Sequence, residues 1–376
     1  MKICLINNLY KPYNRGGAEM YLEKLNKGFK NKGHNVFVVS LKPGLFGKET
    51  GDDYYINSSF YFLDKIPKCL RIFWHLFNVF NFIKYFQVRN ILRDEKPDLV
   101  ITNNLLGFGF LLPVLISKFK IKHIHILHDI QLLHPSGLMF FGKENVINSF
   151  FAKTYQKINK YLFSKVKYVV SPSNWLLDIH KGKGFFAKAI SKRIFNPIDG
   201  FPIKKNFHKR SANNFLYVGQ IEKHKGVVLL IQSMSKIIKN NKNINLKIVG
   251  DGSLRDELED NYGDHVQFLG KLNSDKVHSE MLNADCLLVS SLCYENSPTV
   301  IYEAATMNLN FIYSGLGGAS EIGSYFNGLP FDLSKKDALS ESIEKCIDNI
   351  PKENILNKKV LKLSTSEYIK EILGLL

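Results

Sequence analysis

The sequence predicts an α/β protein of two domains, each with a parallel sheet covered by helices on both faces. Short apolar strands alternate with helical stretches in the first half, and the same alternation restarts after residues 196–199. The chain has 376 residues, which is more than one hydrophobic core usually serves. Strand–helix alternation at this spacing is typical of parallel sheets whose ligands bind at the carboxyl ends of the strands.

Five apolar stretches predict the strands of the first half, at 3–7, 36–40, 99–102, 124–128 and 168–171. Helices are expected over 18–30, with Gly33 as a C-cap, and over 145–164. Gly107, Gly109 and Pro113 interrupt the uncharged run at 99–117. This run therefore predicts a buried strand, a glycine turn and a short helix, and not a membrane span.

The second half repeats the pattern, with strands expected at 215–219, 246–250, 266–269, 286–289 and 311–314. The polar stretch at 196–214, which contains Pro197, is the expected linker. We therefore expect one domain at 1–195 and a second at 196–360.

The net charge is distributed unevenly along the chain. Residues 1–195 hold 30 Lys and Arg against 12 Asp and Glu, whereas residues 196–376 hold 21 against 22. The first domain is therefore expected to meet something anionic. No nucleic-acid recognition motif accompanies this charge, which favours an anionic lipid surface or a solvated basic face over nucleic acid.

One basic, aromatic-rich stretch, at 68–93, interrupts the alternation. Such a helix can lie in a membrane interface, with Arg71, Trp74 and Phe77 among its contacts. The alternative is a helix packed on the first sheet with its basic side solvated, and the sequence favours neither. The five cysteines are scattered without a C-x-x-C pair, which indicates reduced thiols. We expect a cytoplasmic protein that is peripheral on the inner face of the membrane.

Glycines follow several of the expected strands. Gly16 and Gly17 open the first helix, where free backbone N–H groups can approach a phosphate, although a plain turn is the alternative. Gly219 and Gly250 end strands of the second half, and Ser253 is the expected N-cap of the helix after Gly250.

Two glutamates flank seven residues in the stretch 290–304. Glu295 lies at the end of a strand, Glu303 lies in the following helix, and Pro298 suits that helix's first turn. Free N–H groups there would face a diphosphate, while the carboxylates can accept hydrogen bonds from sugar hydroxyls. Each glutamate alone would be interpreted as a solvated surface residue. Their combination with glycine turns at three strand ends favours a nucleotide-sugar site.

These motifs resemble those of the retaining glycosyltransferases of family 4, which have the GT-B architecture of two Rossmann-like domains facing across a cleft. The resemblance covers nearly the whole chain and is strongest over 196–329. It implies transfer of a hexose from a UDP- or GDP-sugar to a glycolipid or oligosaccharide acceptor in bacterial cell-surface glycan synthesis, such as lipopolysaccharide or capsule synthesis. It also implies that no metal or other cofactor is needed, and that a terminal helix, 361–376, returns to the first domain.

The same resemblance implies residue roles. Glu295 would contact the donor sugar, Glu303 the ribose hydroxyls, and Lys225 the leaving diphosphate. His128 would lie beside the donor sugar, so His128, Lys225 and Glu295 are the expected catalytic residues. The expected donor-binding residues are Gly16, Gly17, Gly219, Gln220, Lys225, Gly250, Phe268, Glu295, Asn296, Ser297, Pro298, Thr299 and Glu303.

The sequence departs from the family in two places. The family usually has arginine at the position of Gln220, and arginine makes bidentate contacts to phosphate that glutamine cannot make. Asn296 and Ser297 replace a commoner aromatic–glycine pair, which leaves the donor sugar open. Two alternatives remain: an epimerase or phosphorylase of the same fold, and a non-catalytic sugar-nucleotide binder, which Gln220 favours.

Several histidines lie close together in the first half, at 123, 125, 128 and 134. His123 and His125 alternate with isoleucines, so both imidazoles are expected on one face of a strand. No cysteine or carboxylate pair completes a set of zinc ligands, and we expect no metal site. For His128, a structural role is the alternative to a role in the active site.

Overall fold

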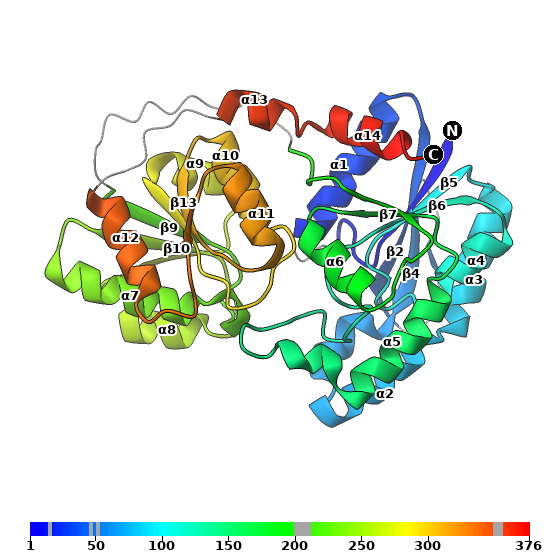
Figure 1. Cartoon of the computed structure of the whole chain (residues 1–376), viewed down its shortest axis with the longest axis horizontal. Helices are drawn as coiled ribbons and strands as arrows, with labels where there is room; N and C mark the ends of the chain where they lie inside the picture. Colours follow the sequence, from blue (N-terminus) through cyan, green and yellow to red (C-terminus); the bar gives the residue numbers. More distant parts are fainter. Residues whose placement is uncertain (14–16, 45–47, 50–52, 199–211, 349–355) are drawn as a thin grey trace. The chain divides into compact units, whose positions relative to one another are not determined.

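The computed structural model describes residues 1–13, 17–44, 48–49, 53–198, 212–348 and 356–376. The chain forms two compact units, shown in Figure 1. The first contains Met1–Leu138, Asn145–Pro197 and Thr365–Leu376, and the second contains Met139–Glu144 and Ile198–Ser364. Each unit has its own parallel sheet with helices on both faces, so the predicted two-domain α/β fold is confirmed.

The sheet of the first unit has the strand order β3-β4-β2-β1-β5-β6-β7-β8 in the described residues. Neighbouring strands are parallel except for β3, which pairs antiparallel with β4. The chain builds outward from β1 in one direction and then from β5 in the other, so the topological switch point lies between these two strands. The strands are β1 (Lys2–Ile6), β2 (Asn35–Pro43), β3 (Lys48–Glu49), β4 (Tyr54–Ser58), β5 (Leu99–Thr102), β6 (Lys122–Ile126), β7 (Tyr168–Ser171) and β8 (Ile190–Arg193).

Helices α1 and α14 cover one face of this sheet. Leu22 and Leu25 of α1 and Ile369 of α14 share a buried core with Leu5 and Ile101 of the strands. Figure 1 shows α14 beside α1, although these helices come from opposite ends of the chain. The helices of the first unit are α1 (Gly17–Asn31), η1 (Ser59–Lys65), α2 (Lys68–Val79), α3 (Phe82–Glu95), α4 (Leu112–Lys118), η2 (Glu144–Asn148, whose first residue belongs to the second unit), α5 (Phe150–Leu162), α6 (Asn174–Gly182) and α14 (Thr365–Leu373).

The stretch predicted as one helix over 68–93 folds as two helices, α2 and α3. The side chain of Asn81 accepts a hydrogen bond of 3.1 Å from the Lys84 N–H and caps α3. Asparagine is favoured at such caps because its side chain competes for backbone hydrogen bonds. The apolar pattern continues through Asn81, so periodicity alone did not indicate the break.

The uncharged run at 99–117 forms β5, a turn and α4, as predicted. Among the described residues, no helix is long and apolar enough to cross a membrane.

The sheet of the second unit has six parallel strands in the order β11-β10-β9-β12-β13-β14. Alternating side chains such as Phe215 and Tyr217 of β9 share a core with α7, α8 and α12 on one face. Strands β10 and β11 lie on one side of β9, and β12 to β14 lie on the other. The switch point is therefore between β9 and β12. The strands are β9 (Asn214–Val218), β10 (Asn245–Val249), β11 (Gln267–Gly270), β12 (Cys286–Val289), β13 (Asn310–Ser314) and β14 (Leu329–Phe331), and the helices are η3 (Lys223–Lys225), α7 (Val227–Asn240), α8 (Arg255–Tyr262), α9 (Ser274–Asn283), α10 (Thr299–Thr306), α11 (Gly317–Tyr325), α12 (Ala338–Asp348) and α13 (Leu356–Leu361).

Candidate active site

The loops after β9 and β12 meet at the switch point of the second sheet. Ser290 Oγ donates a hydrogen bond of 3.0 Å to the Lys225 carbonyl oxygen, and the Leu292 N–H donates one of 2.9 Å to the His224 carbonyl oxygen. These bonds dock η3, which contains Lys225, against the stretch that leads to Glu295. Ligands of open α/β sheets bind at such a place.

Two glycines allow these loops to pack closely. Gly226 has φ +69°, and a Cβ there would lie 1.9 Å from the Ser290 carbonyl oxygen. Gly250 has φ +143°, and a Cβ there would lie 1.8 Å from the Gly219 carbonyl oxygen. A side chain at either position would collide with backbone and require a conformation that L-residues rarely adopt. The absence of a side chain at Gly250 therefore lets the end of β10 lie against the Gly219 carbonyl group, which follows β9.

Lys225 and Glu295 form an ion pair in this loop cluster. Lys225 Nζ lies 3.0 Å from Glu295 Oε1, and the two side chains are 26% and 15% exposed. Ser291 Oγ donates a further hydrogen bond to the same carboxylate oxygen. The structure thus brings together two of the three predicted catalytic residues, although they are separated by 70 positions in the sequence.

Both partners of this pair are charged at neutral pH. Burial by itself would raise the pKa of Glu295, but the Lys225 charge and the hydrogen bonds from Ser291 and Lys225 outweigh burial and lower the pKa. Burial is the largest influence on Lys225 and by itself would lower its pKa, but the Glu295 charge and the hydrogen bond to Glu295, with a smaller contribution from Cys293, together raise that pKa. The loop cluster therefore offers a fixed cation beside a fixed carboxylate.

The start of α10 lies directly after this pair. Pro298 is the N-cap residue of α10, and its side chain makes no capping hydrogen bond. Asn296 is buried, and Ser297 Oγ lies 2.6 Å from Tyr302 Oη. The Glu295 carbonyl oxygen accepts a hydrogen bond of 3.1 Å from the Ala319 N–H of α11. The predicted donor-binding residues Asn296, Ser297, Pro298 and Thr299 thus occupy the loop and first turn, with Glu303 one turn further along α10.

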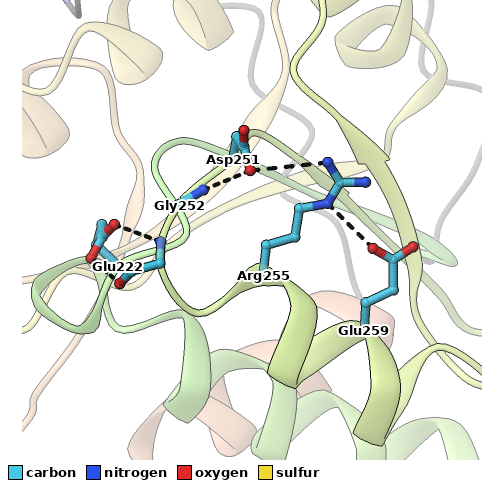
Figure 2. A network of polar contacts seen from close by, with 6 residues as sticks. Glu222, Asp251, Gly252, Arg255 and Glu259 are labelled. Carbon is cyan, nitrogen blue, oxygen red and sulfur yellow. Dashed lines mark hydrogen bonds and ion pairs between the residues drawn. The ribbon is translucent and has the colours of Figure 1, made fainter.

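The turn after β10 is held by a polar network, shown in Figure 2. Both the N–H and the Oγ of Ser253 donate hydrogen bonds of 2.7 Å to the Glu222 carboxylate. Arg255 pairs with Glu259 at 3.3 Å and lies 4.0 Å from Asp251. The prediction that Ser253 caps the next helix was wrong, because α8 begins at Arg255 after Leu254, which makes no side-chain cap. Glu222 engages the serine hydroxyl instead.

The remaining predicted donor-binding residues, apart from Gly16, have less specific environments. Gln220 is exposed, and its carbonyl oxygen accepts a hydrogen bond of 2.7 Å from Tyr217 Oη. Phe268 lies in β11 and packs partly against the core of the second unit. Gly17 is the first residue of α1, and Gly16 lies outside the described residues.

His128 and Asp129 follow β6 in the first unit, close to its switch point. His128 Nε2 lies 3.0 Å from Asn103 Oδ1, after β5, and the His128 ring lies edge-to-face with Tyr21 at 5.1 Å. Burial lowers the pKa of His128 to about 4, so its imidazole is neutral at pH 7. The sequence singled out His128 but not Asn103, its hydrogen-bond partner. The signal that could have identified Asn103 is a polar residue directly after an apolar strand.

The other histidines of this region have structural partners. His123 Nε2 and His125 Nδ1 lie 2.7 and 2.8 Å from Thr102 Oγ1 on the neighbouring strand, and both rings are buried. Both imidazoles lie on one face of β6, as predicted. In the part of the chain that the structure describes, no group of three His, Cys, Asp or Glu side chains is placed to hold a metal ion.

Asp129 is expected to make the stability of the first unit depend on pH. Burial raises its pKa from 3.8 to about 7, although a hydrogen bond of 2.7 Å from the Gln131 N–H opposes the rise. Between these two pH values the folded protein holds more protons than the unfolded chain. We therefore expect the free energy of unfolding to fall as pH rises through this window, with a slope of at most about 1.4 kcal/mol per pH unit.

The variant Asp129→Asn cannot titrate and is expected to lose this slope. Both tryptophans of the chain, Trp74 and Trp175, belong to the first unit, so denaturant titrations at pH 5 and pH 8 followed by tryptophan fluorescence report on that unit. Asp178→Asn, at an exposed position of α6, is the matched control. An equal pH dependence in Asp129→Asn and the wild type would contradict the assignment.

Both halves of the chain match models of glycosyltransferase families. Residues 15–199 match Glycosyltransferase Family 4, and residues 201–362 match Glycosyl transferases group 1. The chain is also similar to a relative from Klebsiella pneumoniae, an uncharacterized 42.6 kDa protein in the cps region. The two are 27% identical over 385 residues, which cover 99% of this chain and 98% of the relative.

Two solved structures share the fold. Alr3699/HepE of Anabaena, in complex with UDP, is 17% identical, covers 100% of both chains and superposes with a TM-score of 0.69. The lipopolysaccharide outer core galactosyltransferase WaaB is 17% identical, with coverage of 100% of this chain and 99% of WaaB and a TM-score of 0.65. Each of the two units has a parallel sheet, and the two family models together span nearly the whole sequence. Both observations indicate the same family. The chain belongs to the GT-B group 1 glycosyltransferase family.

Proposed function

We propose that this glycosyltransferase moves a hexose, with retention of anomeric configuration, from a UDP- or GDP-sugar to a lipid-linked or polysaccharide acceptor in bacterial cell-surface glycan synthesis. The Lys225–Glu295 ion pair carries the proposal, because it holds a cation and a carboxylate at the switch point of the second sheet. The UDP complex of the Anabaena protein supports the donor class. The cps region of the Klebsiella relative and the outer-core activity of WaaB support the pathway.

In the proposed reaction, the bond between the sugar C1 and the diphosphate breaks, and the acceptor hydroxyl oxygen bonds to C1 on the same face. The hydroxyl proton leaves with the diphosphate. Lys225 and the backbone N–H groups at the start of α10 meet the negative charge that develops on the leaving group. These groups provide the neutralisation, so the proposal includes no metal ion or other cofactor. His128, with its neutral imidazole, remains the proposed contact of the first domain to the donor sugar.

A panel of UDP- and GDP-sugars tests the proposal. A ligand that binds the folded protein stabilises it by RT ln(1 + [L]/Kd), so at equal concentrations the tighter-binding nucleotide raises the unfolding temperature more, and thermal shift identifies it. Incubating that donor with and without an acceptor then separates the reaction classes. Transfer is expected only with acceptor. Conversion of the donor sugar without acceptor would indicate an epimerase, a requirement for phosphate would indicate a phosphorylase, and binding without turnover would indicate a binder.

Glu303→Ala is expected to weaken the affinity for the free nucleoside diphosphate. The proposed role of Glu303 is to accept hydrogen bonds from ribose hydroxyls, and losing charged hydrogen bonds of this kind costs about 1.5–3 kcal/mol, or roughly ten- to hundredfold in Kd. Calorimetric titration with UDP and GDP measures the change. Glu341→Ala, at an exposed position in the first turn of α12, is the control. Unchanged affinity in Glu303→Ala would remove Glu303 from the ribose site.

The surface of α2 and α3 supports the anionic leaflet as the proposed partner of the first domain. Of the eighteen large apolar side chains that are exposed among the described residues, eight lie between residues 70 and 86. A cluster of this kind is unusual on a soluble surface and is typical of an interaction site. Arg89 and Arg93 are exposed on α3 nearby, and the first half carries all the excess positive charge. The eight side chains are Leu70, Phe73, Leu76, Phe77, Phe80, Phe82, Ile83 and Phe86.

The three contact residues expected from the sequence differ in exposure. Trp74 is only partly exposed, and its Nε1–H donates a hydrogen bond of 3.1 Å to Ser59 Oγ. Arg71 is likewise partly buried, and its Nε donates to the Ile66 carbonyl oxygen at 2.8 Å. Phe77, in contrast, is 79% exposed. The side chains available to a lipid surface are therefore the exposed phenylalanines and Ile83, whereas Trp74 contacts Ser59 and Phe60 of η1.

The triple variant Phe77→Ser/Phe82→Ser/Ile83→Ser is expected to lose binding to vesicles that contain phosphatidylserine. The wild type is expected to bind such vesicles more weakly as salt rises, because the attraction of about 1 kcal/mol per nearby basic residue fades beyond a Debye length. Leu282→Ser/Leu361→Ser, at exposed apolar positions of the second unit, is the control for sedimentation. Equal binding to neutral and anionic vesicles, or no binding at low salt, would contradict the proposed partner.

A further inference from the structure

The segment Met139–Glu144, called here the crossing segment, belongs to the second unit. The residues on both sides of it, Leu138 and Asn145, belong to the first unit. In the sequence it follows His128 and Asp129 by about ten residues. The chain therefore leaves the first unit for six residues and then returns to it, and no motif in these six residues predicted the excursion.

The backbone of the crossing segment pairs with the stretch that leads to Glu295. Phe140 forms an antiparallel bridge with Cys293. On one side of this bridge the Phe141 N–H donates a hydrogen bond of 2.9 Å to the Leu292 carbonyl oxygen. On the other side the Tyr294 N–H donates one of 2.9 Å to the Met139 carbonyl oxygen. The crossing segment thus adds a short strand to the loop after β12.

A side-chain hydrogen bond reinforces the pairing. Tyr294 Oη donates to Glu144 Oε1 at 2.8 Å, and the Gly142 N–H donates to the same oxygen at 2.8 Å. Hydrogen bonds from backbone N–H groups and from Tyr294 hold the pKa of Glu144 below its usual value, so the acceptor is charged at neutral pH. Hydrogen bonds to a charged acceptor are the stronger kind.

The short helix η3, which contains Lys225, holds the opposite edge of the stretch that leads to Glu295. Leu292 accepts from the Phe141 N–H through its carbonyl oxygen and donates to the His224 carbonyl oxygen through its own N–H. Ser290 Oγ bonds to the Lys225 carbonyl oxygen beside it. The stretch that ends at Glu295 therefore lies between η3 and the crossing segment. Its position decides whether the Glu295 carboxylate meets Lys225 Nζ at 3.0 Å.

We propose that the crossing segment is a positioning strand for Glu295, and that Tyr294 and Glu144 are positioning residues for sugar transfer. This inference rests on the proposed function of Lys225 and Glu295. A loop that follows a strand samples many conformations unless hydrogen bonds on both edges fix it. The crossing segment and the loop that it holds both belong to the second unit, so six residues from the first half of the sequence fix a loop of the second sheet.

Two pairs of variants test the backbone and side-chain contacts separately. Phe141→Pro removes the N–H that bonds to Leu292, and Phe141→Ala keeps that N–H and is the matched control. Glu144→Ala removes the acceptor of the Tyr294 hydroxyl, and Glu144→Gln keeps an oxygen that can accept. We expect kcat for sugar release from the best donor of the panel to fall about tenfold or more in Phe141→Pro and Glu144→Ala. The Kd for UDP or GDP alone is expected to stay within twofold.

Rescue separates positioning from a general structural role. Phe141→Ala and Glu144→Gln are expected to keep kcat within about twofold of the wild type. Equal kcat within each pair of variants would overturn the proposal, as would a parallel loss of kcat, nucleotide affinity and unfolding temperature. Amide hydrogen exchange at 292–294 gives a readout that needs no activity, and it is expected to be faster in Phe141→Pro than in Phe141→Ala. A wild type without donor turnover would contradict the proposed function, and the exchange result would still decide whether the segment holds the loop.

Discussion

Lys225→Met is expected to lower kcat for sugar transfer by about 10²–10³-fold, the loss typical of removing one group that stabilises developing negative charge. Methionine keeps most of the length and the apolar stem of the side chain but removes the charge. The charge matters most as the diphosphate departs, so the loss is expected in kcat more than in the affinity for the intact donor.

Steady-state kinetics with the donor identified by thermal shift measures this effect, and titration with UDP or GDP measures ground-state binding. Lys223→Met is the matched control, because Lys223 is exposed in the same short helix, η3. Its kcat is expected to stay within about twofold of the wild type. Wild-type turnover in Lys225→Met together with a loss in Lys223→Met would move the phosphate role to Lys223.

The fold followed from the alternation of strands and helices because buried strands carry a clear apolar signal. Strands β5, β7 and β12 have the predicted bounds, and their residues are almost all buried. The signal fails at sheet edges. Strand β8, Ile190–Arg193, has exposed residues and two basic side chains, and β14 contains Pro330, so neither reads as a buried strand.

Much of the candidate site was also predictable, since the spacing of Glu295 and Glu303 and the glycines after β9 and β10 are local features. The contact between Lys225 and Glu295 was not predicted from residue patterns. It depends on β9 lying beside β12, and the order of strands in a sheet is a tertiary property.

Two other features of the structure depend on partners that are distant in the sequence. Serine before a helix is usually a cap, but Ser253 bonds to Glu222, which is 31 residues away. The crossing segment has no periodicity because its partners, residues 292–294, lie about 150 positions later in the chain. In both places a distant partner decides the local structure.

Glu295→Gln is expected to lower kcat by roughly ten- to hundredfold, since a charged acceptor for sugar hydroxyls is lost at about 1.5–3 kcal/mol. Glutamine keeps the shape of the side chain and an oxygen that can accept from Ser291 Oγ. It also leaves Lys225 without its counter-charge. The loss of the Glu295 charge removes what raises the pKa of Lys225, so burial then lowers that pKa and weakens the cation.

The two residues are therefore expected to act as a unit, and a double-mutant cycle tests this directly. Losses of residues that act together do not add, so the double variant Lys225→Met/Glu295→Gln is expected to have a kcat within about threefold of Lys225→Met alone. The Lys247–Glu280 pair, with 2.8 Å between Nζ and Oε2, is the control, because it lies in the same unit on β10 and α9. Replacing that pair is expected to leave kcat within twofold. Fully additive losses in the cycle would mean that Lys225 and Glu295 act on the donor independently, and that their ion pair exists only in the absence of substrate.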